Sequence, residues 1–212
     1  MNNKYSFSFT GAGSLLTETI IIAEIYLRLK DWDKVKSSIQ KQNLLNKIKD
    51  STFQREFREI KKRLDLLTEK QIELLISGGS GDAKSMVLIS LIKTYALLRD
   101  FIIEVIRTKY FLFENMITES DYKQFISSKA ISHQEINDIT AITAQKVKTV
   151  IFRILEEIGL ITSSKTGIIV KPYLSDVAIA VIVRDDASLL AGFLYDETEI
   201  NTLKLKLGHG KC

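Results

Sequence analysis

The sequence predicts a mainly α-helical fold: an N-terminal helical bundle, then a winged helix-turn-helix-like unit with one short β-hairpin, then C-terminal helices. Three observations support this prediction. The 212 residues include one proline and ten glycines, and few helix-breaking residues favour long helices joined by short turns. Apolar residues recur at helical spacing along most of the chain. A short β-branched run, IIVKP, begins at Ile168 directly after a polar turn and is typical of a hairpin strand.

The composition excludes several classes of protein. The hydrophobic content of 45% suits a globular domain with a real core. The one cysteine, Cys212, excludes an internal disulfide, and the distant His133 and His209 have no cysteine nearby to complete a zinc site. We expect no metal and no cofactor. Charges interrupt the apolar runs well short of the roughly 18 residues that a membrane span needs, and no signal peptide is evident, so we expect a cytoplasmic protein without membrane contact.

The N-terminal bundle is predicted to contain a helix from about Leu15 to Leu29 and a second over residues 31–42. Ser51 or Thr52 is the expected cap of the third helix. Its apolar face consists of Phe53, Phe57, Ile60, Leu64 and Leu67. Its opposite face is basic and carries Arg55, Arg58, Lys62 and Arg63.

The stretch GGSGDAKS, Gly78 to Ser85, nearly matches a nucleotide-binding loop. That loop requires a glycine before the lysine so that backbone N–H groups can face the phosphates, and Ala83 occupies the position. A helix capped by Thr68 is expected before it, where a true phosphate loop follows a strand. We therefore predict a linker between helices, with Asp82 capping one long helix over residues 83–111; an ATP-driven switch would depend on the imperfect loop.

A second unit is predicted to begin near Asn115, which divides the chain into residues 1–114, 115–174 and 175–212. Three helices are expected in its first part, opened by caps at Thr118 with Asp121, Ser132 with Glu135, and Thr143. The apolar stripe of the third helix consists of Val147, Val150, Ile151, Ile154, Leu155 and Ile158. Gly159 ends this helix, and the turn TSSKTG separates the two hairpin segments.

The tail is predicted to form two helices separated near residues 184–186. Asp185 and Asp186 could suggest a pair of catalytic carboxylates, but adjacent residues diverge on a helix and no histidine lies nearby in the sequence. We expect the protein not to be an enzyme.

A nucleic-acid surface is predicted on the third helix of the second unit. Its solvent side presents Gln145, Lys146, Lys148, Thr149 and Arg153. The turn of the hairpin presents Ser163, Ser164, Lys165 and Thr166. If this helix lies in a major groove, these cations and hydroxyls would contact phosphates. A winged helix used only for packing or as a protein interface is the alternative, because a fold does not establish a function.

The charge distribution favours contact with a polyanion. Residues 28–70 contain 13 Lys/Arg against 7 Asp/Glu, and residues 141–172 contain 5 against 2. Residues 176–200 reverse the sign, with 6 acids against Arg184. Such segregation suits a basic face that meets nucleic acid, although basic helix faces that are simply solvated would look the same in residues 28–70.

Several segments together resemble the BrxA family of bacteriophage exclusion (BREX) phage-defence systems. They are YSFSFTGAGSLLTETIIIAEIYL, DWDKVKSSI, FQREFREIKKRLDLL, TYALLRDFIIEVIRTKY, ILEEIGLI and PYLS. The resemblance extends from Tyr5 to Tyr195 and rests on spaced apolar and charged positions. It implies a non-enzymatic helical component that binds double-stranded DNA and works with other BREX proteins. A scaffold that binds those proteins without DNA is the alternative. The family supplies no residue motif, so the DNA contacts rest on the winged-helix interpretation.

Overall fold

The computed structural model describes residues 4–42, 44–45 and 49–208. The first half contains η1 (Ser8–Gly11), α1 (Leu16–Leu29), α2 (Trp32–Gln42), α3 (Asp50–Leu64), α4 (Glu69–Ser77), α5 (Ser80–Thr94), α6 (Ala96–Phe101), the π-helical η2 (Ile102–Arg107) and α7 (Thr108–Phe111). The second half contains α8 (Glu119–Lys129), α9 (Gln134–Asn137), α10 (Ala141–Ile158), α11 (Asp176–Asp186), η3 (Ala187–Phe193) and α12 (Glu197–Gly208). The predicted mainly helical class is confirmed. Within the described ranges the only β-structure is two isolated antiparallel bridges.

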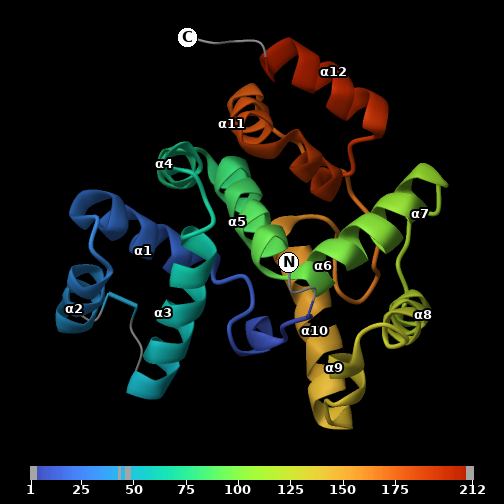
Figure 1. Ribbon diagram of the computed structural model, residues 1–212, viewed down its shortest axis with the longest axis horizontal. Helices are drawn as coiled ribbons and strands as arrows, with labels where there is room; N and C mark the ends of the chain where they lie inside the picture. Colours follow the sequence, from blue (N-terminus) through green and yellow to red (C-terminus); the bar gives the residue numbers. More distant parts are fainter. Residues whose placement is uncertain (1–3, 43, 46–48, 209–212) are drawn as a thin grey trace.

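Helix α5 is the centre of the fold. It contacts α1, α3, α4, α6, α10, α11 and η3, so elements from both halves of the chain surround it (Figure 1). Its residues from Ser85 to Ile92 are all buried, which explains why the sequence of this helix is apolar on every side. The segments before and after it are held in place by packing against a shared core.

The long helix predicted over residues 83–111 is wrong, because Tyr95 divides it. This residue has an extended backbone (φ −121°, ψ 96°) between α5 and α6, and its side chain is fully buried. The extended conformation directs the phenol into a polar cluster with Glu59 and Arg63, at 2.6 and 3.0 Å. The predicted cap at Asp82 is also wrong: the N-cap of α5 is Gly79, and Asp82 accepts a hydrogen bond from Ser175 Oγ at 2.7 Å.

Two of the predicted helix caps are confirmed. Thr68 and Thr118 each accept a hydrogen bond from the backbone three residues later, and Gln71 and Asp121 return the contact. Because both partners of each capping box are close in sequence, these helix starts can be predicted without knowing the tertiary structure.

The other predicted caps are wrong by a few residues. Helix α3 begins at Asp50 rather than after Ser51 or Thr52. Helix α10 begins one turn early, because Thr140 Oγ1 accepts the backbone N–H of Thr143 at 3.2 Å. At α9 the N-cap is His133, without a side-chain cap. The predicted cap pair there, Ser132 with Glu135, does not form, because the Glu135 carboxylate accepts the backbone N–H of Tyr5.

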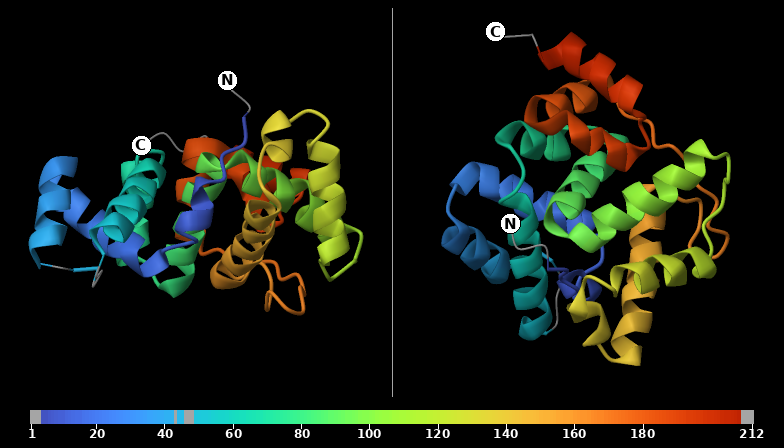
Figure 2. Two further views of the ribbon diagram at one scale, coloured as in Figure 1. Left: turned by 90° about the horizontal axis from the view of Figure 1, so that it is seen from below. Right: turned by 45° about the vertical axis from the view of Figure 1, so that its right-hand side comes forward.

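The C-terminal segment packs against α5 through α11 and η3. Helix α11 ends at Asp186, whose carboxylate accepts the N–H of Ser188 at 2.9 Å, and the chain continues as the 3₁₀ segment η3. The predicted interruption near residues 184–186 is therefore confirmed. Helix α12 then packs against α11 and η3, and Figure 2 shows the three together at one end of the fold. His209 and Cys212 lie outside the described residues.

None of the helices in the described ranges combines the length and the apolar character that crossing a bilayer requires.

Candidate nucleic-acid interface

Helix α10 has one buried face and one solvent face. The predicted core stripe is confirmed, since all six of its residues are buried. On the opposite side Gln145, Lys146 and Thr149 are exposed, and the Arg153 side chain is 54% exposed. Because these side chains follow one another at helical spacing, they form a continuous stripe along the helix.

The segment after α10 folds back as a tight turn. Gly159 ends the helix in the left-handed region, with φ +85°. Thr162 N donates to Ile168 O, and Val170 N donates to Leu160 O, both at 2.9 Å, so residues 160–170 run antiparallel to themselves without forming a regular strand. We call this segment the hairpin loop. It projects beside the C-terminal end of α10 in the left view of Figure 2.

Helix α10 holds the tip of the hairpin loop. The Glu156 carboxylate accepts the backbone N–H of Ser164 at 2.8 Å, and this contact lowers the pKa of Glu156. Ser163 Oγ accepts the N–H groups of Lys165 and Thr166, at 3.1 and 3.3 Å. The tip is therefore fixed relative to the solvent stripe of α10, with Lys165 exposed.

One hollow of about 530 Å³ brings together several of the predicted contacts. Its lining comes from α10, the hairpin loop and the start of α8. The lining residues are Met116, Ile117, Thr118, Glu119, Lys148, Thr149, Phe152, Arg153, Ser164, Lys165 and Thr166. Lys148, Arg153 and Lys165 give it three cations from two elements, which suits an anionic group.

Arg153 of this hollow already pairs with Glu157, at 3.6 Å, and Lys148 is paired as well. Its Nζ lies 3.0 Å from Glu119, and its side chain is 18% exposed. Glu119 also lies 2.9 Å from Lys123. The hydrogen bonds from Lys123 and Lys148 hold the pKa of Glu119 below its usual value, so the hollow contains a carboxylate that competes with any incoming phosphate.

Of the four residues predicted on the basic face of α3, three are exposed and one is buried. Arg55, Arg58 and Lys62 are exposed. The prediction for Arg63 is wrong, because this side chain is fully buried. Its guanidinium donates to the carbonyl oxygens of Gly13 and Ser14, at 2.8 and 2.9 Å, and therefore cannot reach a ligand.

Gly11 to Gly13, at the end of η1, lie close to both basic regions. A Cβ atom added to Gly11 would lie 3.0 Å from Arg55 Cδ, and one added to Gly13 would lie 2.7 Å from Arg153 Nη2. The glycines thus let the backbone run directly beneath an arginine of α3 and an arginine of α10, and η1 contacts both helices (Figure 1). In the sequence, the only sign of this arrangement is the GAG triplet, which the sequence prediction did not use. In the structure, Gly13 has a positive φ.

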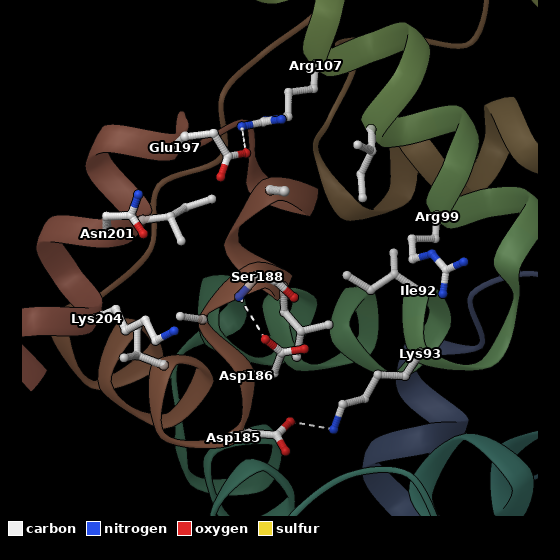
Figure 3. Close-up of a pocket in the computed structure, with 16 residues that line it drawn as sticks. Ile92, Lys93, Arg99, Arg107, Asp185, Asp186, Ser188, Glu197, Asn201 and Lys204 are labelled. Carbon is white, nitrogen blue, oxygen red and sulfur yellow. Dashed lines mark hydrogen bonds and ion pairs between the residues drawn. The ribbon is translucent and has the colours of Figure 1, made fainter. Parts of the chain in front are cut away.

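A larger cavity of about 870 Å³ lies between η2, η3 and α12 (Figure 3). Its charges largely satisfy one another. Lys93 pairs with Asp185, and Arg107 Nη2 lies 2.8 Å from Glu197. These pairs fix the C-terminal helices to the centre of the fold, so we do not take this cavity as the candidate site.

Asp185 and Asp186 make separate contacts. Asp185 accepts a hydrogen bond from Gln71 Nε2 at 3.1 Å in addition to its Lys93 pair, while Asp186 caps η3. Among the described residues, no three of His, Cys, Asp and Glu gather in a way that could hold a metal ion.

The linker between the two helices is shorter than the GGSGDAKS stretch, because Ser80 to Ser85 already belong to α5. Helix α4 precedes it, and Gly78 and Gly79 separate α4 from α5. Ala83 is buried within the first turns of α5, so the backbone there is helical and its N–H groups do not form a phosphate cradle.

Comparison with known proteins identifies the family. The family model described as BrxA matches residues 3–186. The chain belongs to the BrxA family. A curated relative from Paramagnetospirillum magneticum, called BREX protein BrxA, is 28% identical over 157 residues, which is 74% of this chain and 79% of the relative. A second, from Bacillus cereus and also called BREX protein BrxA, is 30% identical over 103 residues, covering 49% and 52%.

A solved structure shares the fold. The crystal structure of an uncharacterized protein from Magnetospirillum magneticum superimposes with a TM-score of 0.79 at 22% identity and covers 90% of this chain and 98% of that one. The two chains therefore share the helical fold.

Proposed function

We propose that this BrxA family member is a non-enzymatic, DNA-binding accessory protein of a BREX phage-defence system. It binds double-stranded DNA mainly through the phosphate backbone and acts in the cytoplasm with other BREX proteins. The observation that carries the proposal is the single hollow where Arg153 and Lys148 of α10 meet Lys165 of the hairpin loop. Two cationic elements fixed at one edge are what backbone recognition requires.

The proposal includes a winged helix-turn-helix role for residues 115–174, between a bundle of residues 1–114 and C-terminal helices in residues 175–212. Helices α8, α9 and α10 precede the hairpin loop in the expected order. The start of the unit is tied to the loop, since Ile169 N donates to Asn115 O and Ile117 N donates to Gly167 O, both at 2.9 Å. In this arrangement α10 enters the major groove and Lys165 contacts a neighbouring phosphate.

The α3 residues extend the proposed track. Arg55 lies against Gly11 and Arg153 lies against Gly13, and η1 contacts both α3 and α10, so the two basic regions are neighbours. Arg58 and Lys62 continue along α3. We expect these three α3 cations to add affinity without determining where the DNA lies.

The test is the binding of a fluorescent DNA duplex across a salt series. One variant carries Lys146→Glu, Arg153→Glu and Lys165→Glu. A second carries Arg55→Glu, Arg58→Glu and Lys62→Glu. A matched control carries Lys70→Glu, Lys204→Glu and Lys206→Glu, three exposed lysines outside the proposed interface, and has the same change in net charge. Each variant is first checked for folding by circular dichroism.

Wild-type protein should bind with an affinity that falls with salt, with a slope of about 0.9 per phosphate neutralised. The first variant should lose binding, the second should weaken it, and the control should bind nearly as well as wild type. Equal losses in the first variant and the control would show that only net charge matters and would overturn the interface. If wild type does not bind, the scaffold alternative stands, and association with BREX proteins should then survive the charge reversals.

A further inference from the structure

The solvent stripe of α10 begins with an apolar side chain that the sequence prediction did not include. Ile142 lies in the first turn of α10 and is 84% exposed. Nine residues later, Ile151 is fully buried. At about 100° per residue, nine residues correspond to half a turn beyond two full turns, so Ile142 lies opposite the centre of the buried face.

Ile142 shares its face with the proposed DNA contacts. Gln145, Lys146, Thr149 and Arg153 follow it at i+3, i+4, i+7 and i+11, the spacing of one helix side. Ile142 is the residue of this stripe nearest the N-terminus, and Ala141 and Ala144 beside it are also exposed. The first turn of α10 contains no acidic residue. The tip of the helix is therefore apolar and is followed by cations.

In a DNA complex, the apolar N-terminus of α10 would favour contact with an apolar group of the bases. The N-terminal residues of a recognition helix lie deepest in the major groove, while residues further along reach the backbone. The groove floor offers one apolar group among the four bases, the 5-methyl of thymine. Lys146 and Arg153, which flank the stripe with positive charge, favour DNA over an apolar protein surface as the occupant of this face.

We propose that Ile142 contacts thymine methyl groups in the major groove and gives the protein a preference for thymine where the N-terminus of α10 meets the bases. This inference rests on the proposed DNA-binding function and deepens it. Gln145, one turn further on, can hydrogen-bond the adenine of the same or a neighbouring pair through its side-chain amide. The phosphate contacts position the helix, and Ile142 supplies the base preference.

The experiment compares duplexes of one A·T-rich sequence in which thymine is kept or replaced by deoxyuridine, which lacks only the 5-methyl group. Binding is measured at one salt concentration for wild type, Ile142→Ala and the control Leu205→Ala, which removes an equally aliphatic side chain that is 66% exposed on α12. Wild type and the control should bind the thymine duplex about fourfold more tightly per methyl group contacted, as expected for one buried methyl group.

Ile142→Ala should lose most of the preference for thymine, because its shorter side chain buries less of the methyl group, and it should keep the wild-type salt slope, because no phosphate contact is removed. Two results would overturn the inference: equal binding of both duplexes by wild type, or a preference for thymine as large in Ile142→Ala as in wild type. Failure of the proposed function is a distinct result, in which wild type binds neither duplex.

Discussion

Arg63 and Tyr95 are joined by a buried hydrogen bond in which Arg63 Nε lies 3.0 Å from the phenol oxygen. The phenol in turn donates to Glu59 at 2.6 Å, and the other guanidinium nitrogens donate to backbone carbonyls of Gly13 and Ser14. This cluster joins α3, the segment before α1 and the junction of α5 with α6. An arginine on a predicted basic face is thus the polar centre of the core.

Replacing Arg63 should therefore destabilise the protein strongly. In Arg63→Leu the buried Glu59 loses its neighbouring cation and two carbonyls lose their donors, so the free energy of unfolding should fall by about 3–5 kcal/mol. Urea denaturation followed by circular dichroism measures it. The matched change on the exposed side of the same helix, Arg58→Leu, should stay within about 0.5 kcal/mol of wild type. Similar losses of unfolding free energy in the two variants would mean that the buried cluster does not contribute more to stability than an exposed arginine.

Alkaline pH should weaken the same cluster. Burial raises the pKa of Tyr95 to about 12, and the charge of Arg63 only partly offsets this. Because the folded-state pKa is above the usual value near 10, the contribution of Tyr95 to stability is complete below about pH 10 and is lost as the pH rises through about 12. Burial also raises the pKa of Tyr122, so Tyr95 accounts for part of the effect.

Tyr95→Phe should make the free energy of unfolding decline less steeply than in wild type between pH 10 and 12. The measurement is a series of urea titrations across that interval. Tyr173→Phe, at a side chain that is 86% exposed, should follow the wild-type curve. A Tyr95→Phe curve parallel to wild type throughout would rule out titration of this phenol as a cause of alkaline unfolding.

Local patterns in the sequence were enough for the helical class, for the N-cap at Thr68, for the capping box at Thr118 and for the buried stripe of α10. Each depends on residues within one or two turns of each other. The break at Tyr95 was not predictable in this way, because the residue has no turn propensity and its extended backbone is stabilised by Glu59 and Arg63, more than 30 residues away.

The candidate site shows the same limit. Helical spacing identified the exposed side of α10 but placed Arg63 on the surface, since periodicity alone cannot distinguish the edge of a basic face from a buried polar cluster. It also could not show that Glu119 pairs with Lys148 or that Gly11 and Gly13 lie against Arg55 and Arg153. These contacts join elements that are distant in the sequence, and local patterns within a single sequence do not predict them.

Two glycines of the second unit should respond differently to the same substitution. Gly159 and Gly167 both have positive φ, +85° and +65°, which costs a non-glycine residue about 1–2 kcal/mol. An added Cβ meets nothing within 4 Å at Gly159 but lies 2.1 Å from the carbonyl oxygen of Ile117 at Gly167.

Gly159→Ala should therefore lower the free energy of unfolding by about 1–2 kcal/mol, and Gly167→Ala should lower it further because the backbone near Ile117 must move. Thermal and urea unfolding of the two variants give the comparison. Gly167→Ala should also weaken DNA binding more than Gly159→Ala, since it displaces the hairpin loop from α10. Equal stability losses would show that the loop adjusts without cost.

Removing the carboxylate of Glu119 should strengthen DNA binding. In the free protein this group holds Lys148 at 3.0 Å, and the hydrogen bonds from Lys123 and Lys148 lower its pKa. A phosphate that enters the hollow must displace this pair and approach a negative charge. Glu119→Gln removes the repulsion and releases Lys148, so affinity should rise several-fold and the salt slope should increase by about 0.9, the value for one additional phosphate contact. Glu197→Gln is the matched control, because Glu197 is also an exposed, ion-paired glutamate but belongs to α12, and it should leave both quantities unchanged. An affinity for Glu119→Gln equal to wild type, with an unchanged slope, would place the DNA away from the hollow and leave α3 as the surface to test next.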